Sequence, residues 1–415
     1  MKIATLGSGG REHAIAWKLS QVKDGREVFL FPGNPGFANS KNIDISNFSY
    51  LRKFCLENEI SLLVPGSESI LADGIVESFR DSGISVFGPD KQASRLESSK
   101  IWAKNFMSRY GVATAPFHSF HSVDDARNCV MDMDGSLVVK YDGLAAGKGV
   151  FLCSSIEESM ASLDYLRKRY GENVPFLIEE KLFGEEVSLI AFTDGKSVKL
   201  LSPSQDHKRA FDEDEGPNTG GMGAYCPVPF WTEELENRVM KEIISPTLKG
   251  IRSENFDYKG VIYFGIIVTE EGPKLLEYNV RFGDPEAQVI LPALKTDLLT
   301  LIQGCLEGDL QNRDLEFHSG VFLDVVLASG GYPGKYDLGY EISGMETIHP
   351  ETLLFHSGTA LENGKVVTNG GRVLNLVSWG ENLWEASNKV YKECEKICFA
   401  KSFYRKDIGR RALPV

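Results

Sequence analysis

Residues 274–286 read Lys-Leu-Leu-Glu-Tyr-Asn-Val-Arg-Phe-Gly-Asp-Pro-Glu. Apolar and polar side chains alternate over most of this stretch, which predicts a β-strand with one polar and one apolar face. Because successive side chains of a strand point to opposite faces, we expect Glu277, Asn279 and Arg281 to project together. Carboxylate and amide oxygens are ligands that Mg²⁺ takes beside phosphate, and a guanidinium neutralises a phosphoryl group.

A plainer interpretation of this strand is a solvated polar face with an incidental salt bridge. The turn Gly283-Asp284-Pro285-Glu286 follows directly and adds two carboxylates at the end of the strand. Phosphoryl transfer depends mainly on positioning and charge stabilisation, so the absence of a nucleophilic Ser, Cys or His from this segment is no objection. The stretch therefore predicts a nucleotide site with a metal ion.

Two segments upstream carry further polar groups. Residues 178–187 end an apolar strand with clustered acids, whose carboxylates can hold ribose hydroxyls while the backbone at the bend reads an adenine edge. Residues 204–209 (Ser-Gln-Asp-His-Lys-Arg) and the turn at 216–223 bring hydrogen-bond donors together beside glycines. His207 taken alone is typical of a hydrogen-bonded structural histidine, so we assign it no part in the mechanism.

A glycine-rich loop lies farther upstream, at 140–150 (Lys-Tyr-Asp-Gly-Leu-Ala-Ala-Gly-Lys-Gly-Val). It is one residue too short between its glycines for a P-loop, and Gly149 stands where that motif has a metal-binding hydroxyl. Its small residues favour a lid whose backbone amides close over triphosphate, with Lys140 as a fixed countercharge. A plain hairpin turn is the alternative.

The first glycine loop, at 7–13 (Gly-Ser-Gly-Gly-Arg-Glu-His), follows an apolar strand. Glu12 stands where a dinucleotide-binding motif has its third glycine, and no acidic residue closes the second strand, which argues against that motif. A strand, a glycine turn and a helix start still form an anion site from backbone N–H groups, to which Arg11 can add a forked contact. A tight turn without a ligand is the alternative.

The composition is that of a soluble globular protein. The chain has 415 residues, which is too long for a single hydrophobic core. Its net charge of −13 argues against a nucleic-acid-binding protein, which would be expected to have a basic face. Seven cysteines without paired spacing indicate reduced thiols. Cys394 and Cys398 are four residues apart, so we expect them on one face of a helix, and we expect no zinc site there because no second Cys or His pair is nearby. We find no signal peptide and no apolar run that could cross a bilayer, and we expect a cytoplasmic protein.

The order of predicted elements indicates a mixed α/β and α+β multidomain fold. Apolar strands that alternate with helical patterns predict a parallel sheet at the N-terminus, with strands at 3–6, 28–31, 60–64 and 84–87. A helical stretch follows at 91–115. A small α+β unit follows, with strands at 137–140, 150–153 and 176–180 and a helix near 157–170. The last expected elements are helices at 232–252 and 384–400 and short strands at 321–327, 366–368 and 372–377.

Together these motifs resemble the ATP-grasp ligases, and within them the glycinamide ribonucleotide synthetase family. The matching stretches run in the family's order along essentially the whole chain, at 7–14, 32–36, 140–150, 204–209, 216–224, 281–286, 369–374 and 405–409. The resemblance implies four parts: a Rossmann-like sheet at 1–100, an ATP-grasp lid subdomain with its leading helix at 101–186, a central catalytic subdomain at 187–315 and a β-rich domain at 316–415.

The resemblance also implies an activity, that of an ATP-dependent ligase of purine biosynthesis. The carboxylate of glycine would take the γ-phosphoryl group of ATP to give glycyl phosphate and ADP. The amine of 5-phosphoribosylamine would then displace phosphate and give glycinamide ribonucleotide. A monomer with small-molecule substrates and no nucleic-acid or membrane partner is expected.

The family's site residues carry over position by position. Binding of ATP falls to Lys100, Lys140, Gly143, Gly147, Lys148, Gly149, Glu179, Glu180, Leu182 and Glu186. Binding of Mg²⁺ or Mn²⁺ falls to Glu277 and Asn279, and the reacting groups would be faced by Arg281, Asp284, Glu286 and Lys148. The two other substrates would be bound by Gly9, Gly10, Arg11, Asn34, Gly36, Glu68, Asp206, Lys208, Arg209, Asn218, Thr219 and Gly220.

The chain departs from the family in one loop. Residues 66–72 read Gly-Ser-Glu-Ser-Ile-Leu-Ala, whereas the family usually has Gly-Pro-Glu-x-Pro-Leu-Val. Glu68 is kept but both prolines are replaced, so we expect a less rigid loop at the phosphoribosylamine site. Two other functions stay open: another ATP-grasp carboxylate–amine or carboxylase-type ligase with a different acceptor, and a non-catalytic nucleotide sensor.

Overall fold

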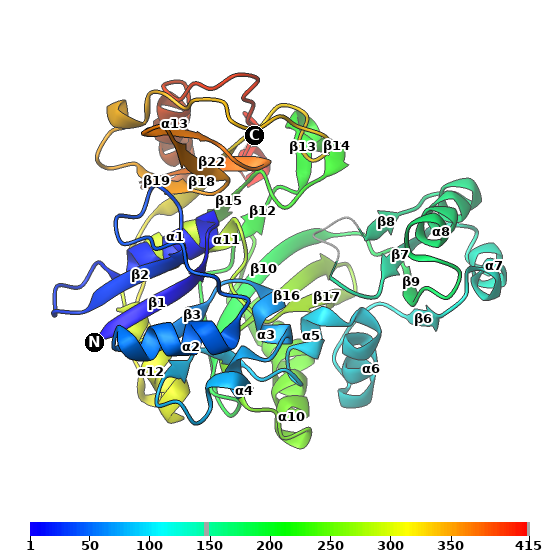
Figure 1. Ribbon diagram of the computed structural model, residues 1–415. Helices are drawn as coiled ribbons and strands as arrows, with labels where there is room; N and C mark the ends of the chain where they lie inside the picture. Colours follow the sequence, from blue (N-terminus) through cyan, green and yellow to red (C-terminus); the bar gives the residue numbers. More distant parts are fainter. Residues whose placement is uncertain (145–148, 413–415) are drawn as a thin grey trace.

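A computed structural model describes residues 1–144 and 149–412 (Figure 1). Within these ranges the strands form four sheets of four or five strands and two two-stranded ribbons. Figure 1 shows the N-terminal sheet at the left, the C-terminal sheet above it, and a small unit of strands and helices projecting to the right. The predicted mixed α/β and α+β architecture is confirmed.

The N-terminal sheet is entirely parallel, in the order β2-β1-β3-β4. Its strands lie at the four predicted places: β1 (Lys2–Gly7), β2 (Glu27–Pro32), β3 (Ile60–Pro65) and β4 (Ser85–Val86). Helix α1 (Gly10–Leu19) packs on one face of the sheet, and α2 (Phe48–Glu57) and α4 (Ile75–Phe79) pack on the other. The loops after β1, β2 and β3 therefore meet at one edge, where parallel sheets bind ligands.

The predicted loop at 66–72 is wrong, because its last five residues form a short helix, α3 (Glu68–Ala72). Ser67 occupies the N-cap position with an extended backbone, and Glu68 places a negative charge in the first turn. An acidic residue there is stabilised by the helix dipole, which favours a helical backbone in this segment although it lacks the prolines.

The central sheet is antiparallel, in the order β11-β10-β16-β17, and β5 (Gly88–Pro89) joins it by pairing with β16. Its strands are β10 (Glu185–Thr193), β11 (Val198–Leu200), β16 (Tyr258–Thr269) and β17 (Gly272–Asn279). Its helices are α5 (Arg95–Ser98), α6 (Lys100–Tyr110), α9 (Glu233–Val239), α10 (Ser245–Ser253) and α12 (Leu298–Glu307). The long helix predicted at 232–252 is one helical run in which a π-helical stretch, Met240–Ile244, joins α9 to α10.

The projecting unit, which we call the lid unit, has its own sheet and core. The sheet order is β6-β9-β7-β8, all antiparallel. Its elements are β6 (Phe117–Phe120), α7 (Val123–Asp132), β7 (Leu137–Tyr141), β8 (Val150–Leu152), α8 (Ile156–Tyr170) and β9 (Phe176–Glu180). Apolar side chains of both helices pack on one face of this sheet and form a core separate from the rest.

The C-terminal sheet has the order β12-β15-β18-β22-β19, and helices cover both its faces: α11 (Glu286–Ala293) lies on one and α13 (Leu383–Cys394) on the other. Its strands are β12 (Gln205–Asp206), β15 (Gly223–Cys226), β18 (Val321–Ala328), β19 (Leu353–His356) and β22 (Arg372–Gly380). Two ribbons, β13–β14 (Arg209–Phe211, Glu215–Asn218) and β20–β21 (Thr359–Glu362, Lys365–Thr368), lie beside it. The sheet thus takes strands from both sides of residue 315.

The last helix is shorter than predicted. It ends at Cys394, so Cys398 lies beyond it and is exposed, and the expectation of a shared helix face is wrong. Cys398 instead pairs with Ser343 through backbone hydrogen bonds, which replace the helical pattern. All seven cysteines are free thiols, as expected.

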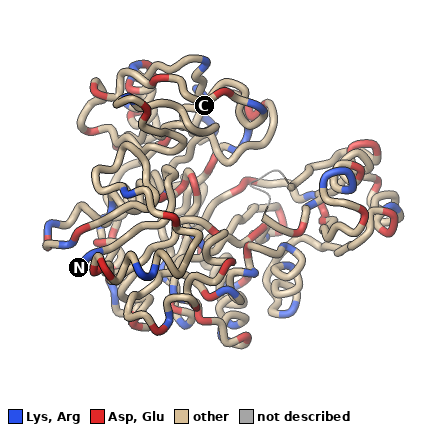
Figure 2. The backbone as a smooth tube through the Cα atoms, in the orientation of Figure 1, with Lys and Arg blue, Asp and Glu red and all other residues tan. Residues whose placement is uncertain are grey.

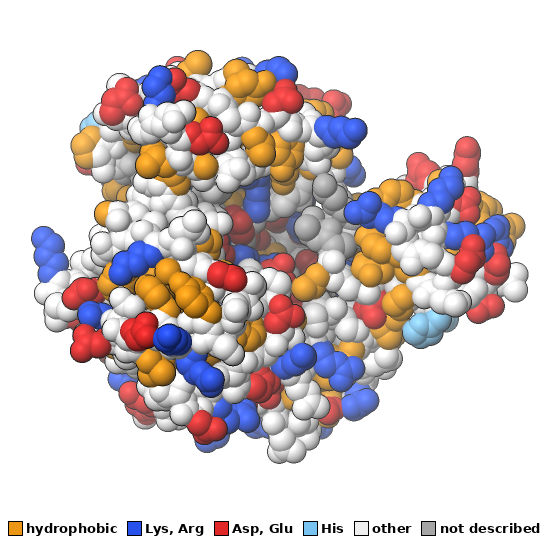
Figure 3. Space-filling model, in the orientation of Figure 1, with side chains coloured by type: hydrophobic (Ala, Val, Ile, Leu, Met, Phe, Trp, Pro, Cys, Tyr) orange, Lys and Arg blue, Asp and Glu red, His pale blue; other side chains and the backbone are white. Residues whose placement is uncertain are grey.

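The surface is mixed in charge. Figure 2 shows acidic and basic residues interspersed along the parts of the chain in view. Figure 3 shows a hollow between the N-terminal, C-terminal and lid regions, with charged side chains inside it. In the part of the chain that the structure describes, no helix is long and apolar enough to span a membrane.

Candidate active site

The site begins with a buried carboxylate between two lysines. Glu179, in β9, has its Oε2 atom 3.0 Å from Lys140 Nζ and 2.9 Å from Lys104 Nζ, and all three side chains are almost fully buried. Burial raises the pKa of Glu179, but the two lysines outweigh it and the net pKa is below the usual range. Burial lowers the pKa of Lys104 to about 8. The other carboxylate oxygen of Glu179 is buried and has no partner among the described residues.

Lys104 was missed by the sequence analysis. It lies one helical turn after Lys100 in α6, inside an otherwise ordinary amphipathic helix. Its Nζ also donates to Thr114 Oγ1 at 2.7 Å. Only the burial of Lys104 distinguishes it from an ordinary surface lysine of a helix, and burial cannot be read from the sequence pattern.

The first residues of the loop at 140–150 are attached to the start of α6. Lys100 Nζ donates to the carbonyl of Gly143 at 3.0 Å, and burial lowers its pKa. Asp142 accepts hydrogen bonds from the Ile101 amide at 3.0 Å and from the Ser99 hydroxyl at 3.2 Å. At the far end of the loop the carbonyl of Gly149 accepts from the Tyr141 amide at 2.8 Å. The predicted ATP ligands Gly147 and Lys148 lie outside the described residues.

The other predicted nucleotide residues lie at the junction of β9 and β10. Glu180 is exposed, and its backbone amide donates to the carbonyl of Pro116 at 3.1 Å. Leu182 is half-buried in the connection that follows. Glu186, in β10, is exposed and forms an ion pair with Lys208.

The polar face of β17 holds the predicted metal ligands. A bulge at Leu276 interrupts the regular alternation, but Tyr278 and Val280 are buried as expected on the apolar side. Asn279 Oδ1 accepts from Arg281 Nη2 at 3.2 Å, so these two side chains share a face. The Glu277 carboxylate has neither hydrogen bond nor ion pair within the described residues, and it lies close enough to Lys100 to oppose the lowering of that lysine's pKa by burial.

The residues present fit a divalent ion that also binds phosphate. Glu277 and Asn279 supply two hard oxygen atoms, the ligand type that Mg²⁺ prefers. Across the described ranges, no group of three or more His, Cys, Asp or Glu side chains could hold a metal alone. An ion at Glu277 and Asn279 would therefore complete its shell with nucleotide oxygens and water, as Mg²⁺ commonly does.

Arg281 is held between two carboxylates. Its Nε atom is 3.1 Å from Glu68 Oε2 and its Nη2 atom 2.7 Å from Glu97 Oε1. Glu97 also accepts from the backbone amide of Val280 at 2.8 Å, and burial raises its pKa to about 7. Glu97 was not among the predicted residues, because it lies in the short helix α5, whose local pattern carries no signal, and only the fold brings it to β17.

A second cluster of charges lies around β12. Lys208 Nζ is 2.6 Å from Glu186 Oε2 and 3.7 Å from Asp206 Oδ1. Burial raises the pKa of Asp206 to about 7; Lys208 opposes this, while Glu286 and Glu186 add to it. Glu286 Oε1 accepts from the hydroxyls of Ser188 at 3.0 Å and Tyr263 at 3.1 Å, which fix its orientation.

The remaining residues of this loop have other tasks. Arg209 donates to the carbonyl of Gly216 at 2.8 Å, within the β13–β14 ribbon that also contains Asn218. The hydroxyl of Thr219 donates to the carbonyl of Lys208 at 2.9 Å. The amide of Gly220 donates to the Tyr332 hydroxyl at 3.0 Å, and its carbonyl accepts from Arg372.

His207 is structural, as predicted. Its Nε2 atom accepts from the Gly409 amide at 3.1 Å, and burial lowers its pKa to about 3, so the ring is neutral.

The first glycine loop faces the turn after β17. Arg11 donates to Glu12 at 2.7 Å and to the carbonyl of Phe282 at 3.2 Å. The amide of Gly9 donates to Glu12 Oε2 at 2.8 Å, so the loop's own carboxylate takes a donor that we had expected to bind substrate. A Cβ atom on Gly10 would lie 2.5 Å from Asn375 Nδ2, which leaves no room for a side chain.

Asp284 lies beside this loop. Its Oδ2 atom forms an ion pair with Arg372 Nη2 at 2.8 Å, and its Oδ1 atom accepts from Gln288 Nε2 at 2.7 Å. Burial raises the pKa of Asp284, but Arg372 and Arg11 outweigh burial and the net pKa is lowered.

Asn34 and Gly36 fasten the loop after β2 to the C-terminal sheet. Asn34 Nδ2 donates to the carbonyls of Ser8 and His356 at 3.0 Å each, and its Oδ1 accepts from the Gly36 amide at 3.1 Å. A Cβ atom on Gly36 would lie 2.2 Å from the His356 ring. These two residues therefore shape the edge of the site by packing, with the side chain of Asn34 fully engaged.

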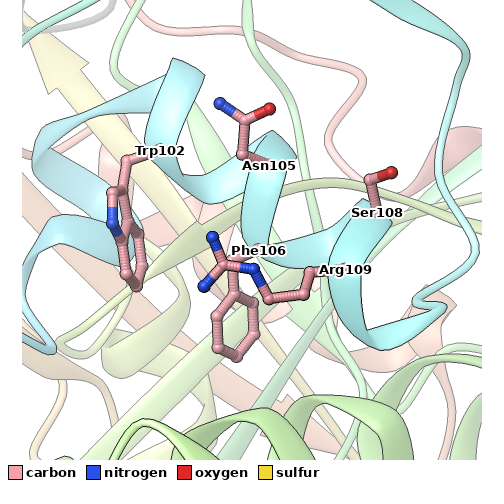
Figure 4. Close-up of a pocket in the computed structure, with 5 residues that line it drawn as sticks. All are labelled: Trp102, Asn105, Phe106, Ser108 and Arg109. Carbon is pink, nitrogen blue, oxygen red and sulfur yellow. The ribbon is translucent and has the colours of Figure 1, made fainter.

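A cavity of about 340 Å³ lies elsewhere, on the outer face of α6 (Figure 4). Figure 4 shows its five lining side chains projecting from that helix: Trp102, Asn105, Phe106, Ser108 and Arg109. None of them belongs to the charged clusters above, so we assign the cavity no part in the site.

Comparisons with known proteins cover nearly the whole chain. Family models match three successive parts: the N domain of phosphoribosylglycinamide synthetase at 1–97, its ATP-grasp (A) domain at 98–287 and its C domain at 322–411. The phosphoribosylamine–glycine ligase of Halalkalibacterium halodurans is 44% identical, over 100% of this chain and 97% of that protein. The human trifunctional purine biosynthetic protein adenosine-3 is 46% identical over 99% of this chain and 42% of its own length.

Solved structures agree. The crystal structure of phosphoribosylamine–glycine ligase from Thermotoga maritima has a TM-score of 0.86 and 36% identity, and the match covers 98% of this chain and 100% of that one. The biotin carboxylase domain of 2-oxoglutarate carboxylase from Hydrogenobacter thermophilus has a TM-score of 0.72 at 16% identity, over 97% of this chain and 91% of that one. The second match shows a shared fold alone.

Proposed function

This chain belongs to the phosphoribosylglycinamide synthetase family, and from that premise we propose that it joins glycine to 5-phosphoribosylamine at the expense of ATP. Glycyl phosphate forms first, and the amine of phosphoribosylamine then displaces phosphate to give glycinamide ribonucleotide. The ATP-grasp family implies use of ATP with a divalent metal ion. The choice of Mg²⁺ or Mn²⁺, a cytoplasmic location and a monomeric state are parts of the proposal.

One observation supports the proposal most: two clusters of different chemistry lie within electrostatic reach of each other. Glu277 of β17 and Ser188 of β10 both pair with Gly265 of β16. The Ser188 hydroxyl donates to Glu286 in the cluster around Asp206 and Lys208. A phosphoryl donor at Glu277 would therefore lie near a lysine that can hold a carboxylate.

The two clusters have separate proposed tasks. Lys140 and Lys100 hold the phosphates of ATP, and a divalent ion at Glu277 and Asn279 supplies charge neutralisation when bound. Lys208 orients the carboxylate of glycine, while Asp206 and Glu286 accept hydrogen bonds from its ammonium group. The lid unit excludes water, which would otherwise hydrolyse the acyl phosphate.

At the other edge of the site we assign phosphoribosylamine to the first glycine loop and its neighbours. Arg11, Arg281 and Arg372 bring three guanidinium groups to the turn at 281–284. Planar forks of this kind recognise phosphate. Gly10 and Gly36 give the close approach that this packing needs.

Product formation tests the function directly. Purified protein with ATP, Mg²⁺ and glycine should release ADP and phosphate in step with glycinamide ribonucleotide only when freshly made phosphoribosylamine is added. Equal turnover with another small amino acid, or with a different amine acceptor, would favour another ATP-grasp ligase. Nucleotide binding with no turnover under any of these conditions would favour a sensor.

A further inference from the structure

The segment Arg405–Gly409, near the end of the chain, belongs to a motif that the proposed function leaves unexplained. Arg405 is almost fully buried, although it is a surface residue type. Its Nη1 atom donates to Asp214 Oδ1 at 2.9 Å and to the carbonyl of Arg209 at 3.2 Å. Its Nε and Nη2 atoms each lie 2.8 Å from one carboxylate oxygen of Asp407. Arg405 thus joins the C-terminal segment to the β13–β14 ribbon.

Backbone groups of the segment and the ribbon add three more contacts. The Lys406 amide donates to Asp212 Oδ1 at 2.7 Å. The amide of Glu213 donates to Asp407 Oδ2 at 2.8 Å, and the amide of Gly409 donates to His207 Nε2 at 3.1 Å. Every residue from 405 to 409 except Ile408 therefore contacts the stretch 207–214 by a hydrogen bond.

These contacts fall on a backbone turn that is unfavourable by itself. Glu213 has φ 60° and Asp214 has φ 55°, two consecutive non-glycine residues in the left-handed region. Such conformations persist only where surrounding structure enforces them, and they cluster at functional sites. Here the enforcing groups are Asp407, which holds the Glu213 amide, and Arg405, which holds the Asp214 carboxylate.

The turn leads directly to the charged cluster around β12. His207, which accepts the Gly409 amide, stands between Asp206 and Lys208 in the chain. The carbonyl of Lys208 accepts from both the amide and the hydroxyl of Thr219, at the other end of the ribbon. A shift of the ribbon would therefore move Asp206 and Lys208 relative to Glu186.

We propose that Arg405–Gly409 is a clasp that positions Asp206 and Lys208 for the amino-acid substrate. Arg405 and Asp407 touch no substrate and act as positioning residues. The inference rests on the proposed function, because that function assigns Asp206 and Lys208 to glycine. Within the described part of the chain, residues 405–409 make no hydrogen bond with Lys100, Lys140 or Glu179, and Glu186 is held in β10 by its pairing with β16, so the clasp should affect glycine and leave ATP binding unchanged.

Asp407→Asn tests the clasp, because it removes the ion pair with Arg405 and keeps the size of the side chain. We expect KM for glycine to rise about tenfold, within the range for a binding group misplaced by a fraction of an ångström, while KM for ATP stays within about twofold. Adding Glu213→Gly, which adopts a positive φ without strain, should recover part of this loss. Lys401→Met is the matched control: it breaks an exposed ion pair with Asp337 in the same C-terminal region and should change neither KM.

A merely structural role predicts a different pattern. If Asp407→Asn raises both KM values together, or lowers the melting temperature with no change in KM for glycine, the clasp proposal is overturned. Asp212→Ala, at an exposed residue, removes a single hydrogen bond and serves if Asp407→Asn does not fold. A rise of about twofold or more in KM for glycine alone would support the clasp, and no rise would overturn it. Failure of the proposed function is separate, since wild-type protein would then show no glycine-dependent turnover with phosphoribosylamine.

Discussion

Glu179 and Asp206 are both buried carboxylates, on opposite sides of the site, and their surroundings differ. Two lysines share one oxygen of Glu179, at 2.9 and 3.0 Å, and hold its pKa below the usual range despite burial. Asp206 has one lysine at 3.7 Å and lies near two further carboxylates, and burial raises its pKa to about 7. On the nucleotide side the Glu179 carboxylate therefore stays ionised near neutral pH, while on the substrate side the Asp206 carboxylate changes its charge there.

The difference follows from what each side must bind. A nucleotide triphosphate carries several negative charges at any pH near neutrality, so a cluster of lysines suits it. A small zwitterion needs groups of both signs, and an excess of carboxylates around one carboxyl group raises the pKa of that group, so that it holds its proton more tightly. The junction of the two sides, at Glu277, and each side alone can be disturbed by separate substitutions.

Glu277→Ala removes a proposed metal ligand at the junction and should have the largest effect. We expect kcat to fall by about 100- to 1000-fold, because charge stabilisation in the reacting complex is lost. The melting temperature should hardly change, since Glu277 makes no ion pair within the described residues. Glu271→Ala is the control. Glu271 lies on the exposed turn before β17, and among the described residues its carboxylate forms an ion pair with Lys274 alone. Wild-type turnover of the Glu277 variant at saturating Mg²⁺ would show that the metal lies elsewhere.

Lys104→Met disturbs the nucleotide side alone. It leaves Glu179 with one lysine instead of two, and breaking a buried pair costs about 3–5 kcal/mol of stability. Lys140 is then the one lysine that pairs with Glu179, so it is less available to bind the phosphates of ATP. We therefore also expect KM for ATP to rise about tenfold and KM for glycine to stay constant. Titration with denaturant and initial rates at varied ATP measure the two effects.

The control for Lys104 is Lys18→Met. Lys18 is also a buried lysine, with burial lowering its pKa to about 8, and it donates to the carbonyl of Leu294 away from the site. Its loss should lower stability by about 1–3 kcal/mol without changing either KM. Equal rises in KM for ATP in both variants would mean that Lys104 acts only through the fold.

Asp206→Asn disturbs the substrate side, and its effect should depend on pH. The pKa of Asp206 is about 7 in the folded protein against 3.8 as its ordinary value. Between these values the unfolded chain releases the proton and the folded chain keeps it, so this group lowers stability as pH rises from about 4 to about 7. Asn carries no such penalty. The stability of the variant relative to wild type should therefore increase over that range and level off above it.

The size of this effect has an upper bound. A shift of about three units at about 1.4 kcal/mol each gives about 4 kcal/mol, and the loss of contact with Lys208 reduces the gain. Denaturant titrations of both proteins at pH 5 and pH 8 measure it. A difference in stability between them that is the same at both pH values would show that Asp206 is ionised throughout. The same variant should raise KM for glycine.

The sequence predicted the strands well and the interior contacts poorly. The alternating pattern at 274–286 gave β17 and the common face of Asn279 and Arg281, because side-chain alternation is a local property of a strand. Glu97 and Lys104 were missed, since each becomes special only through partners that the fold brings from β17 and β9. For the same reason the sequence did not show that the Gly9 amide and the Asn34 side-chain amide already donate hydrogen bonds within the protein.

The segment at 66–72 belongs to the substrate side, and Ser67→Pro should have the smallest effect. The family's proline at this position was expected to rigidify a loop, but residues 68–72 already form α3 with Ser67 at its N-cap. The φ of Ser67 is −100°, outside the range of about −65 ± 15° that proline adopts, so the backbone must shift, and this cost offsets the gain of about 0.4–1 kcal/mol from a stiffer unfolded chain. KM for phosphoribosylamine should fall less than about twofold, because Arg281 already holds Glu68 at 3.1 Å. A large gain in affinity for phosphoribosylamine would mean that α3 does not fix Glu68, and that the segment at 66–72 is as flexible as the replaced prolines predict.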